Sequence, residues 1–286
     1  MHRRREAWWL IAPLAIFMVV WLGFPFLSNL YYSLSDVTFE TLSSPTLTGF
    51  DNFADAAGSA AFWQSLWFSL RFAVIATTAQ IIIALTLAIA LRPLLERYRF
   101  LLAILILPLM ISPALMGIMY KLMLNEFVGV VPQYLALFGL YPNLLGPDWV
   151  VTVVIAIEVL QWTPFALLLL LTALQAIPDE LLDAAYVDGA RPRDQVRRIV
   201  LPLMGPAIAI TAFIRFIDSF RVFDHIYVLT GGGPGTLTTS SSIFIYRAFF
   251  QQGRLGFAIA SSLILMAFSL LLLWATMRYV LKGART

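Results

Sequence analysis

Four ionisable side chains lie deep inside long apolar stretches of this 286-residue sequence, where a charge is costly. Arg71, Glu158, Arg215 and Asp218 each lie nine to 14 residues from the start of such a stretch. At about 1.5 Å per helical residue, this places them roughly 14 to 21 Å deep, near the middle of a bilayer. An ionisable group at that depth costs at least about 2.5 kcal/mol, so each is a candidate for a functional site. The four could share one cavity.

One helical face combines polar and aromatic side chains in a pattern that suits a sugar. Glu158, Gln161, Trp162 and Phe165 follow the spacing i, i+3, i+4, i+7, which places them on one side of a helix. Carboxylates and amides hydrogen-bond hydroxyl groups, while flat rings pack against the apolar faces of a pyranose. The pattern therefore predicts part of a sugar path. Arg71 could equally meet an anionic substrate group or pair with Glu158.

Charged residues of alternating sign follow in a later stretch. Arg215, Asp218, Arg221 and Asp224 are each three residues apart, so they can pair within one helix. A purely structural role, in which such charges neutralise one another or join helices, is the alternative for this group and for the polar face described above.

Cysteine and histidine, which are common in catalytic and metal sites, are absent or nearly absent. The sequence holds no cysteine and two histidines, which excludes disulfides, cysteine nucleophiles and cysteine-ligated zinc. The run Gly231–Gly235 lacks the lysine of a phosphate-binding loop, so it predicts a tight turn in an outer loop. We predict no catalytic residue, no metal site and no cofactor bound by this chain, which is not expected to be an enzyme.

The composition indicates that membrane helices position these residues. It is 60% hydrophobic and 12% charged, with a mean hydropathy of +0.85, whereas soluble domains are about a quarter charged. The net charge of +3 is spread thinly, so lipid rather than nucleic acid is the expected surrounding. Six stretches reach the roughly 20 apolar residues that a transmembrane helix needs. They are Trp8–Leu30, Phe62–Leu91, Phe100–Leu122, Trp149–Leu174, Met204–Leu229 and Phe257–Val280.

The predicted fold is therefore an all-α integral membrane protein with six transmembrane helices. No repeat or low-complexity stretch divides the sequence, so we predict a single membrane domain over residues 1–286. The third span carries Pro108, Pro113 and Gly117, which predicts a kinked helix.

The orientation follows from the distribution of basic residues, because short cytoplasmic loops carry an excess of lysine and arginine. The loop from Ser33 to Ala61 contains four acidic residues and no basic one, so it is predicted to be external. Both termini are then cytoplasmic. The basic residues on that side number 13 of 19 and are Arg3, Arg4, Arg5, Arg92, Arg97, Arg99, Arg191, Arg193, Arg197, Arg198, Arg278, Lys282 and Arg285.

The cytoplasmic connection 175–203 reads as two short helices. Pro178 suits a first helical position with two acidic residues after it, and Gly189 suits the stop. A second helix starts at Pro192, and Pro202 is expected to break the chain before the next span. In the first helix, apolar and small side chains form a stripe that predicts a docking surface, or alternatively a helix lying on lipid headgroups. The stripe is Leu181, Leu182, Ala184 and Ala185.

This connection also carries a family resemblance. The stretch LLDAAYVDGARPRDQVRRIVLP resembles the EAA loop of permease subunits in binding-protein-dependent ABC importers. Asp183 stands where that family usually has glutamate, so the negative charge is kept but the side chain is shorter by one methylene group. The resemblance implies that ATPase coupling involves Asp183, Ala184, Ala185, Asp188, Gly189, Ile199, Leu201 and Pro202.

Two further stretches narrow the resemblance to the carbohydrate-uptake branch, which is similar to maltose and glycerol-phosphate permeases. They are LTALQAIPDEL and FRVFDHIYVLTGGGPGTLTTSSSIFIYRAFF. The resemblance implies the ABC importer permease fold and a bacterial inner-membrane location. It also implies a second permease subunit, two cytoplasmic subunits that bind ATP and Mg²⁺ and grip the loop around Gly189, and a periplasmic or extracellular solute-binding protein.

The substrate class implied is a sugar or sugar derivative, with oligosaccharide, polyol, sugar phosphate and other anionic derivatives all open. The path candidates are Arg71, Glu158, Gln161, Trp162, Phe165, Asp218 and Arg221. An ion-coupled secondary transporter with a relay of ionisable groups is the main alternative, and a purely structural membrane subunit is another.

Overall fold

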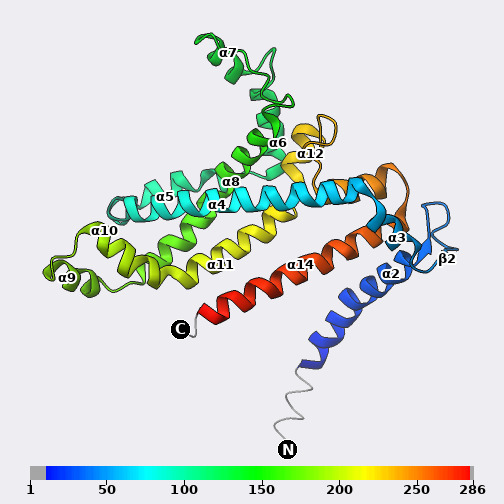
Figure 1. Ribbon diagram of the computed structural model, residues 1–286, viewed down its shortest axis with the longest axis horizontal. Coiled ribbons are helices and arrows are strands. Elements are labelled where there is room, and N and C mark those ends of the chain that lie inside the picture. Colours follow the sequence, from blue (N-terminus) through cyan, green and yellow to red (C-terminus); the bar gives the residue numbers. More distant parts are fainter. Residues whose placement is uncertain (1–10, 284–286) are drawn as a thin grey trace, which may run out of the picture. The chain divides into compact units, whose positions relative to one another are not determined.

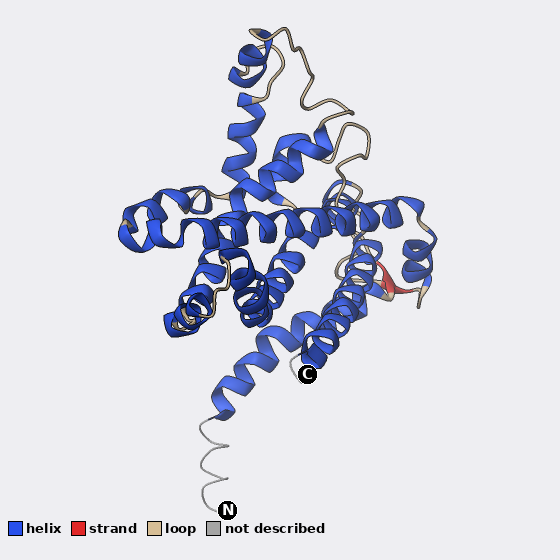
Figure 2. Ribbon diagram, turned by 60° about the vertical axis from the view of Figure 1, so that its left-hand side comes forward, coloured by secondary structure: helices blue, strands red, loops and turns tan. Residues whose placement is uncertain are grey.

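A computed structural model describes residues 11–283 of the chain (Figure 1). The predicted basic residues Arg3, Arg4, Arg5 and Arg285 and the start of the first predicted span lie outside these residues. In the described part, loops join helices and one short strand pair (Figure 2). By residue contacts the chain divides into two compact units, one made of residues 1–64 with 244–268 and the other of 65–243 with 269–286.

The elements follow one another in this order: η1 (Val19–Gly23), α2 (Phe24–Ser33), β1 (Ser35–Asp36), β2 (Thr46–Leu47), α3 (Asp51–Gly58), α4 (Ala60–Arg97), α5 (Arg99–Leu105), η2 (Leu107–Met110), α6 (Pro113–Met123), α7 (Val130–Ala136), α8 (Val150–Gln175), α9 (Asp179–Val187), α10 (Pro192–Gln195), η3 (Val196–Val200), α11 (Leu201–Phe220), α12 (Asp224–Thr230), α13 (Ser241–Tyr246), η4 (Arg247–Gln251) and α14 (Leu255–Gly283).

Five helical stretches within the described residues are long and apolar enough to cross a membrane, and they confirm five of the six predicted spans. They are Ile11–Ser33, Ala60–Arg97, Val150–Gln175, Pro192–Thr230 and Leu255–Trp274. The third predicted span is not the single kinked helix that we expected, because it is broken into α5, the 3₁₀ turn η2 and α6. Ile111 and Ser112 are extended ahead of Pro113, since proline disfavours the helical conformation in the residue before it.

The fifth span differs from the prediction at both ends. Pro202 does not break the chain: α10, the π-helical segment η3 and α11 follow one another without a gap. The Leu201 N–H donates to the Val196 carbonyl, a π-type bond that re-pairs the backbone beside the proline. At the other end, α11 stops at Phe220 and α12 begins at Asp224, so the span is interrupted where one helix was expected.

In the first unit, an antiparallel strand pair is held against the start of α14. β1 pairs with β2, with Ser35 opposite Leu47. The Asn52 side chain donates to the carbonyl oxygens of Ser33 and Ser35 at 3.1 and 2.8 Å. A Cβ at Gly256 would collide with the Ser35 carbonyl oxygen, so this close approach of two backbones requires glycine.

The second unit contains two apolar clusters along α4 and α8. One cluster includes Phe72 and Ile157, and the other includes Ala84 and Leu167. The buried polar residues Gln80 and Glu158 fall between these positions on their helices. The unit therefore holds a polar layer between two apolar layers.

Contacts at the two ends of α4 separate the predicted coupling loop from the glycine-rich run. Near the end of α4, Arg92 binds Asp179 of α9, with Nη2 and Oδ1 2.8 Å apart. Near its beginning, the Ser69 hydroxyl accepts a hydrogen bond from the Ser241 N–H, just after the glycine-rich run. The two loops thus lie toward opposite ends of α4, as the predicted topology requires.

Candidate functional site

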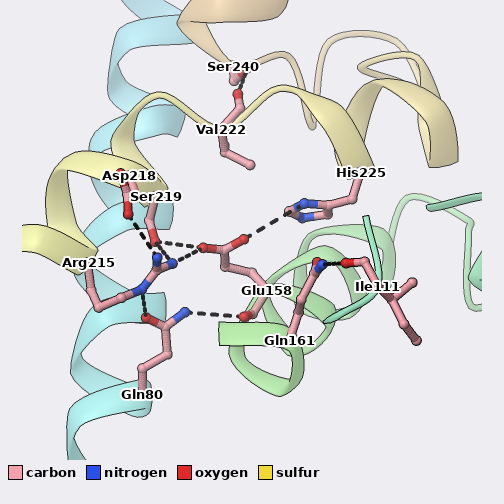
Figure 3. A network of polar contacts seen from close by, with 10 residues as sticks. All are labelled: Gln80, Ile111, Glu158, Gln161, Arg215, Asp218, Ser219, Val222, His225 and Ser240. Atoms are coloured by element: carbon pink, nitrogen blue, oxygen red, sulfur yellow. Dashed lines mark hydrogen bonds and ion pairs between the residues drawn. The ribbon is translucent and has the colours of Figure 1, made fainter. Parts of the chain in front are cut away.

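Three helices bring a buried ion pair together in the polar layer (Figure 3). Arg215 of α11 donates through Nη2 to Glu158 Oε1 of α8 at 2.7 Å. The Gln80 amide of α4 links both helices, because its Oε1 accepts from Arg215 Nε at 3.0 Å and its Nε2 donates to the Glu158 carbonyl at 3.2 Å. Arg215 is 0% exposed and Glu158 2% exposed. Such a pair is tolerated away from water only when nearly every donor and acceptor is satisfied.

Further contacts complete the surroundings of Arg215. Its Nη1 donates to Asp218 Oδ2 at 3.1 Å, and its Cζ lies 4.4 Å from the centre of the Trp162 ring. The Ser219 hydroxyl donates to Glu158 Oε1 at 2.8 Å. His225 of α12 lies on the other side, with Nδ1 3.8 Å from Glu158 Oε2.

Sequence reasoning missed Gln80, Ser219 and His225 in this network. Gln80 had a readable signal, because it is an amide in the middle of an apolar span. Ser219 had none, since serine is common in membrane helices. His225 reaches Glu158 only because α12 begins a new direction after the break that follows α11.

A cavity of about 300 Å³ opens beside this network. Six of its lining residues were predicted from the sequence as path candidates or charged partners. They are Glu158, Trp162, Arg215, Asp218, Arg221 and Asp224. The remaining lining residues are Pro113, Val222, Phe223 and His225. The breaks before α6 and α12 therefore supply part of the cavity wall.

Three path candidates lie outside the lining. Arg71 is exposed, and its Cζ lies 5.8 Å from the Trp67 ring, so the predicted alternative of pairing with Glu158 is wrong: Arg215 occupies that place. Gln161 is buried and donates to the Ile111 carbonyl at 2.9 Å, at the break in the third span. Phe165 packs edge-on against Trp162, with ring centres 6.4 Å apart.

The alternating charges do not share one helix as we expected. Arg215 and Asp218 form the predicted i, i+3 pair. Arg221, however, caps the end of α11, and Asp224 starts α12, so the break separates them and both are exposed.

The predicted coupling helix is present as α9, and it ends as its sequence indicates. Gly189 has φ +79°, and the Ala190 N–H donates to the Ala185 carbonyl at 2.9 Å, which closes the helix in the manner of a Schellman motif. Pro178 is the N-cap rather than the first helical residue, with Asp179 and Glu180 in the first turn.

The apolar stripe of α9 divides between two sides. Leu182 packs against the second apolar cluster and Ala185 is half-buried, whereas Leu181 and Ala184 are exposed. Val187 at the end of the helix is 84% exposed. The helix is thus anchored on one side and presents the other to its surroundings.

The glycine-rich run forms the predicted tight turn. Gly231 ends α12 with φ +63°, and Gly232 and Gly235 also have positive φ. The hydroxyl groups of Thr230 and Thr238 are hydrogen-bonded at 2.8 Å across the turn.

Comparisons with known proteins bear on the identity of the chain. Residues 5–280 match the family described as binding-protein-dependent transport system inner membrane component. The trehalose/maltose transport system permease protein MalF of Thermococcus litoralis is 34% identical over 89% of this chain and 86% of its own length. The trehalose transport system permease protein SugA of Mycobacterium tuberculosis is 30% identical over 93% of this chain and 85% of its own.

A solved structure has the same fold. That structure is a bacterial ABC transporter involved in the import of the acidic polysaccharide alginate. The match to one of its chains has a TM-score of 0.83 and 23% sequence identity, and it covers 98% of this chain and 96% of the other. The match over residues 5–280 shows that this chain belongs to the family of inner membrane components of binding-protein-dependent transport systems.

Proposed function

We propose that this chain is one of two permease subunits of an ABC importer that takes up a sugar or sugar derivative through the bacterial inner membrane. The observation that carries the proposal is the similarity to named sugar permeases along nearly the whole chain. A third relative, the sn-glycerol-3-phosphate transport system permease protein UgpA of Shigella flexneri, is 29% identical over 96% of this chain. The second permease subunit would supply the other half of the path.

In this proposal α9 receives the mechanical work. ATP and Mg²⁺ bind to two separate cytoplasmic subunits, which grip the exposed side of α9 around Ala184 and Gly189. The anchored side, with Leu182 against the core and Asp179 bound to Arg92, passes the movement to the spans. Asp183, exposed on α9, supplies the acidic group of the matched motif.

The substrate path follows the cavity beside the polar layer. An external solute-binding protein delivers the sugar, and the cavity-lining side chains of α8 and α11 contact it during passage. Glu158 and Arg215 hold the wall together, while Trp162 and the exposed Asp218 face the cavity. The chain itself performs no chemistry.

A backbone-matched pair of glycine substitutions tests the coupling role. Gly189 and Gly139 have φ +79° and +74°, and neither has an atom within 4 Å of a built Cβ. Valine should therefore introduce similar strain at both positions. In proteoliposomes with the complete complex, Gly189→Val should abolish sugar uptake and sugar-stimulated ATPase activity, whereas Gly139→Val, in the connection before α8, should retain both.

Two results would contradict the proposal. One is normal uptake and ATPase stimulation with Gly189→Val in an assembled complex. The other is uptake by the isolated chain, driven by an ion gradient with no ATPase subunits present, which would indicate a secondary transporter.

A further inference from the structure

The charges that line the cavity do not balance. Three carboxylates face two guanidinium groups, which leaves a formal charge of −1 when His225 is neutral. The carboxylates are those of Glu158, Asp218 and Asp224, and the guanidinium groups are those of Arg215 and Arg221.

Arg215 has little left to offer a substrate. Its Nε is engaged by Gln80, its Nη1 by Asp218 and its Nη2 by Glu158. An anionic group that took these donors would leave the Glu158 carboxylate buried without its partner, which is strongly unfavourable. One face of the Arg215 guanidinium is also covered by Trp162.

The groups that remain accessible at the cavity are more acidic than basic. The Asp218 side chain is 55% exposed, and Asp224 and Arg221 are also exposed. The two carboxylates can accept hydrogen bonds from hydroxyl groups, and the guanidinium group can donate hydrogen bonds to them. An anion, however, meets net repulsion there. The half-buried rings of Trp162 and Phe223 add apolar surface to the wall.

We infer that the half of the path supplied by this chain selects an uncharged polyhydroxy solute and disfavours sugar phosphates and uronates. This inference rests on the proposed function. The relatives do not settle the matter, because they are named for trehalose or maltose in some cases and for sn-glycerol-3-phosphate in another. The cavity charge of this chain distinguishes between these classes.

The first test uses the complete complex in proteoliposomes. A panel of neutral mono-, di- and oligosaccharides and polyols is compared with glycerol 3-phosphate and alginate oligosaccharides, and uptake and stimulated ATPase activity are measured. The inference expects the transported solute among the neutral compounds. Transport of an anionic sugar would overturn the inference and leave the proposed function standing, whereas no transport of any sugar would overturn both.

The second test changes the charge of the cavity and keeps hydrogen-bond acceptors in place. The variant Asp218→Asn with Asp224→Asn moves the lining from −1 to +1. It should raise the ratio of anionic to neutral uptake on the order of tenfold. The control, Glu126→Gln with Asp148→Asn, makes the same change in net charge at exposed residues outside the lining and should leave the ratio unchanged. An unchanged ratio in the cavity variant, or an equal rise in the control, would overturn the inference.

Discussion

At the scale of single residues, the charged groups of the fourth and fifth spans have unequal surroundings. Glu158 and Arg215 are sealed from solvent and satisfied by each other, by Gln80 and by Ser219. Asp218 shares the same arginine but is 55% exposed. Removing a buried partner leaves an uncompensated charge, whereas an exposed partner is replaced by water.

We therefore expect Glu158→Ala to destabilise the protein by about 3 to 5 kcal/mol, because it leaves Arg215 buried and unpaired. Asp218→Ala should cost less than about 1 kcal/mol. Unfolding of the purified protein in detergent, followed by loss of helical circular dichroism, measures both. Equal losses would show that the ion pair is not the structural centre of the polar layer. A transport assay of Glu158→Ala therefore needs an assembly control.

At the scale of elements, the interrupted spans are held by close helix packing. α6 packs against α12, and a Cβ on Gly117 would lie 3.0 Å from the His225 carbonyl oxygen and 3.1 Å from the Val228 Cβ. The α6 helix can approach α12 so closely only because residue 117 has no side chain. Gly205 in α11 has no neighbouring atom within 4 Å of a built Cβ.

This contrast makes a matched pair of alanine substitutions informative. Gly117→Ala should destabilise the protein by about 1 to 3 kcal/mol through overpacking against α12. Gly205→Ala should be neutral or stabilise by up to about 1 kcal/mol, because alanine is the better helix former and meets open space. Thermal unfolding in detergent compares the two, and a harmless Gly117→Ala would contradict the close packing.

The ion pair between Arg92 and Asp179 joins α4 to α9, the helix proposed to receive the mechanical work. Arg92 also binds Glu96 at 2.9 Å, and its side chain is mostly buried. Either Arg92→Asp or Asp179→Arg should reduce sugar-stimulated ATPase activity by up to about fivefold, as expected for a partly exposed pair worth about 1 kcal/mol. The double swap should recover most of the loss. Arg97→Asp, at the end of the same helix, is the control and should have little effect. Failure of the swap to recover activity would argue that the pair does not transmit movement.

At the scale of the whole molecule, the second unit has two distinct ends. The basic residue Arg92 and α9 lie toward one end of α4, and the turn after Gly231 lies toward the other. In the predicted orientation the end that carries α9 is cytoplasmic, and the turn after Gly231 and the connection containing α7 are external.

The absence of cysteine allows a direct test of orientation. Phe138→Cys and Val187→Cys introduce single thiols at two exposed positions, 80% and 84% exposed respectively. In intact cells that produce this chain without the proposed ATPase subunits, and whose outer membrane is permeabilised, a membrane-impermeant maleimide should label residue 138 and not residue 187. Residue 187 should react once the inner membrane is opened. The reverse pattern would invert the topology.

Much of the fold could be predicted because its signals are local. The length of an apolar run determines whether a helix can cross a membrane, and five such runs became helices. Proline, the acidic first turn and Gly189 placed α9 within one residue of where it lies. The break in the third predicted span was harder to predict, because proline has different effects at different positions. Pro113 follows an extended residue at that break, whereas Pro202 lies in a continuous helix.

By itself, the sequence determined that the chain is a membrane protein, where five of the six predicted spans lie, that α9 ends before Gly189, and which family the chain resembles. These follow from composition and from patterns within one helix, which do not depend on distant partners. Only the tertiary structure decided that Arg215 rather than Arg71 pairs with Glu158, that Gln80 and His225 join them, and that Asp218 stays exposed. Such choices depend on how α4, α8 and α11 rotate and where α12 turns, because a buried charge takes whichever partner the packing brings within about 3 Å.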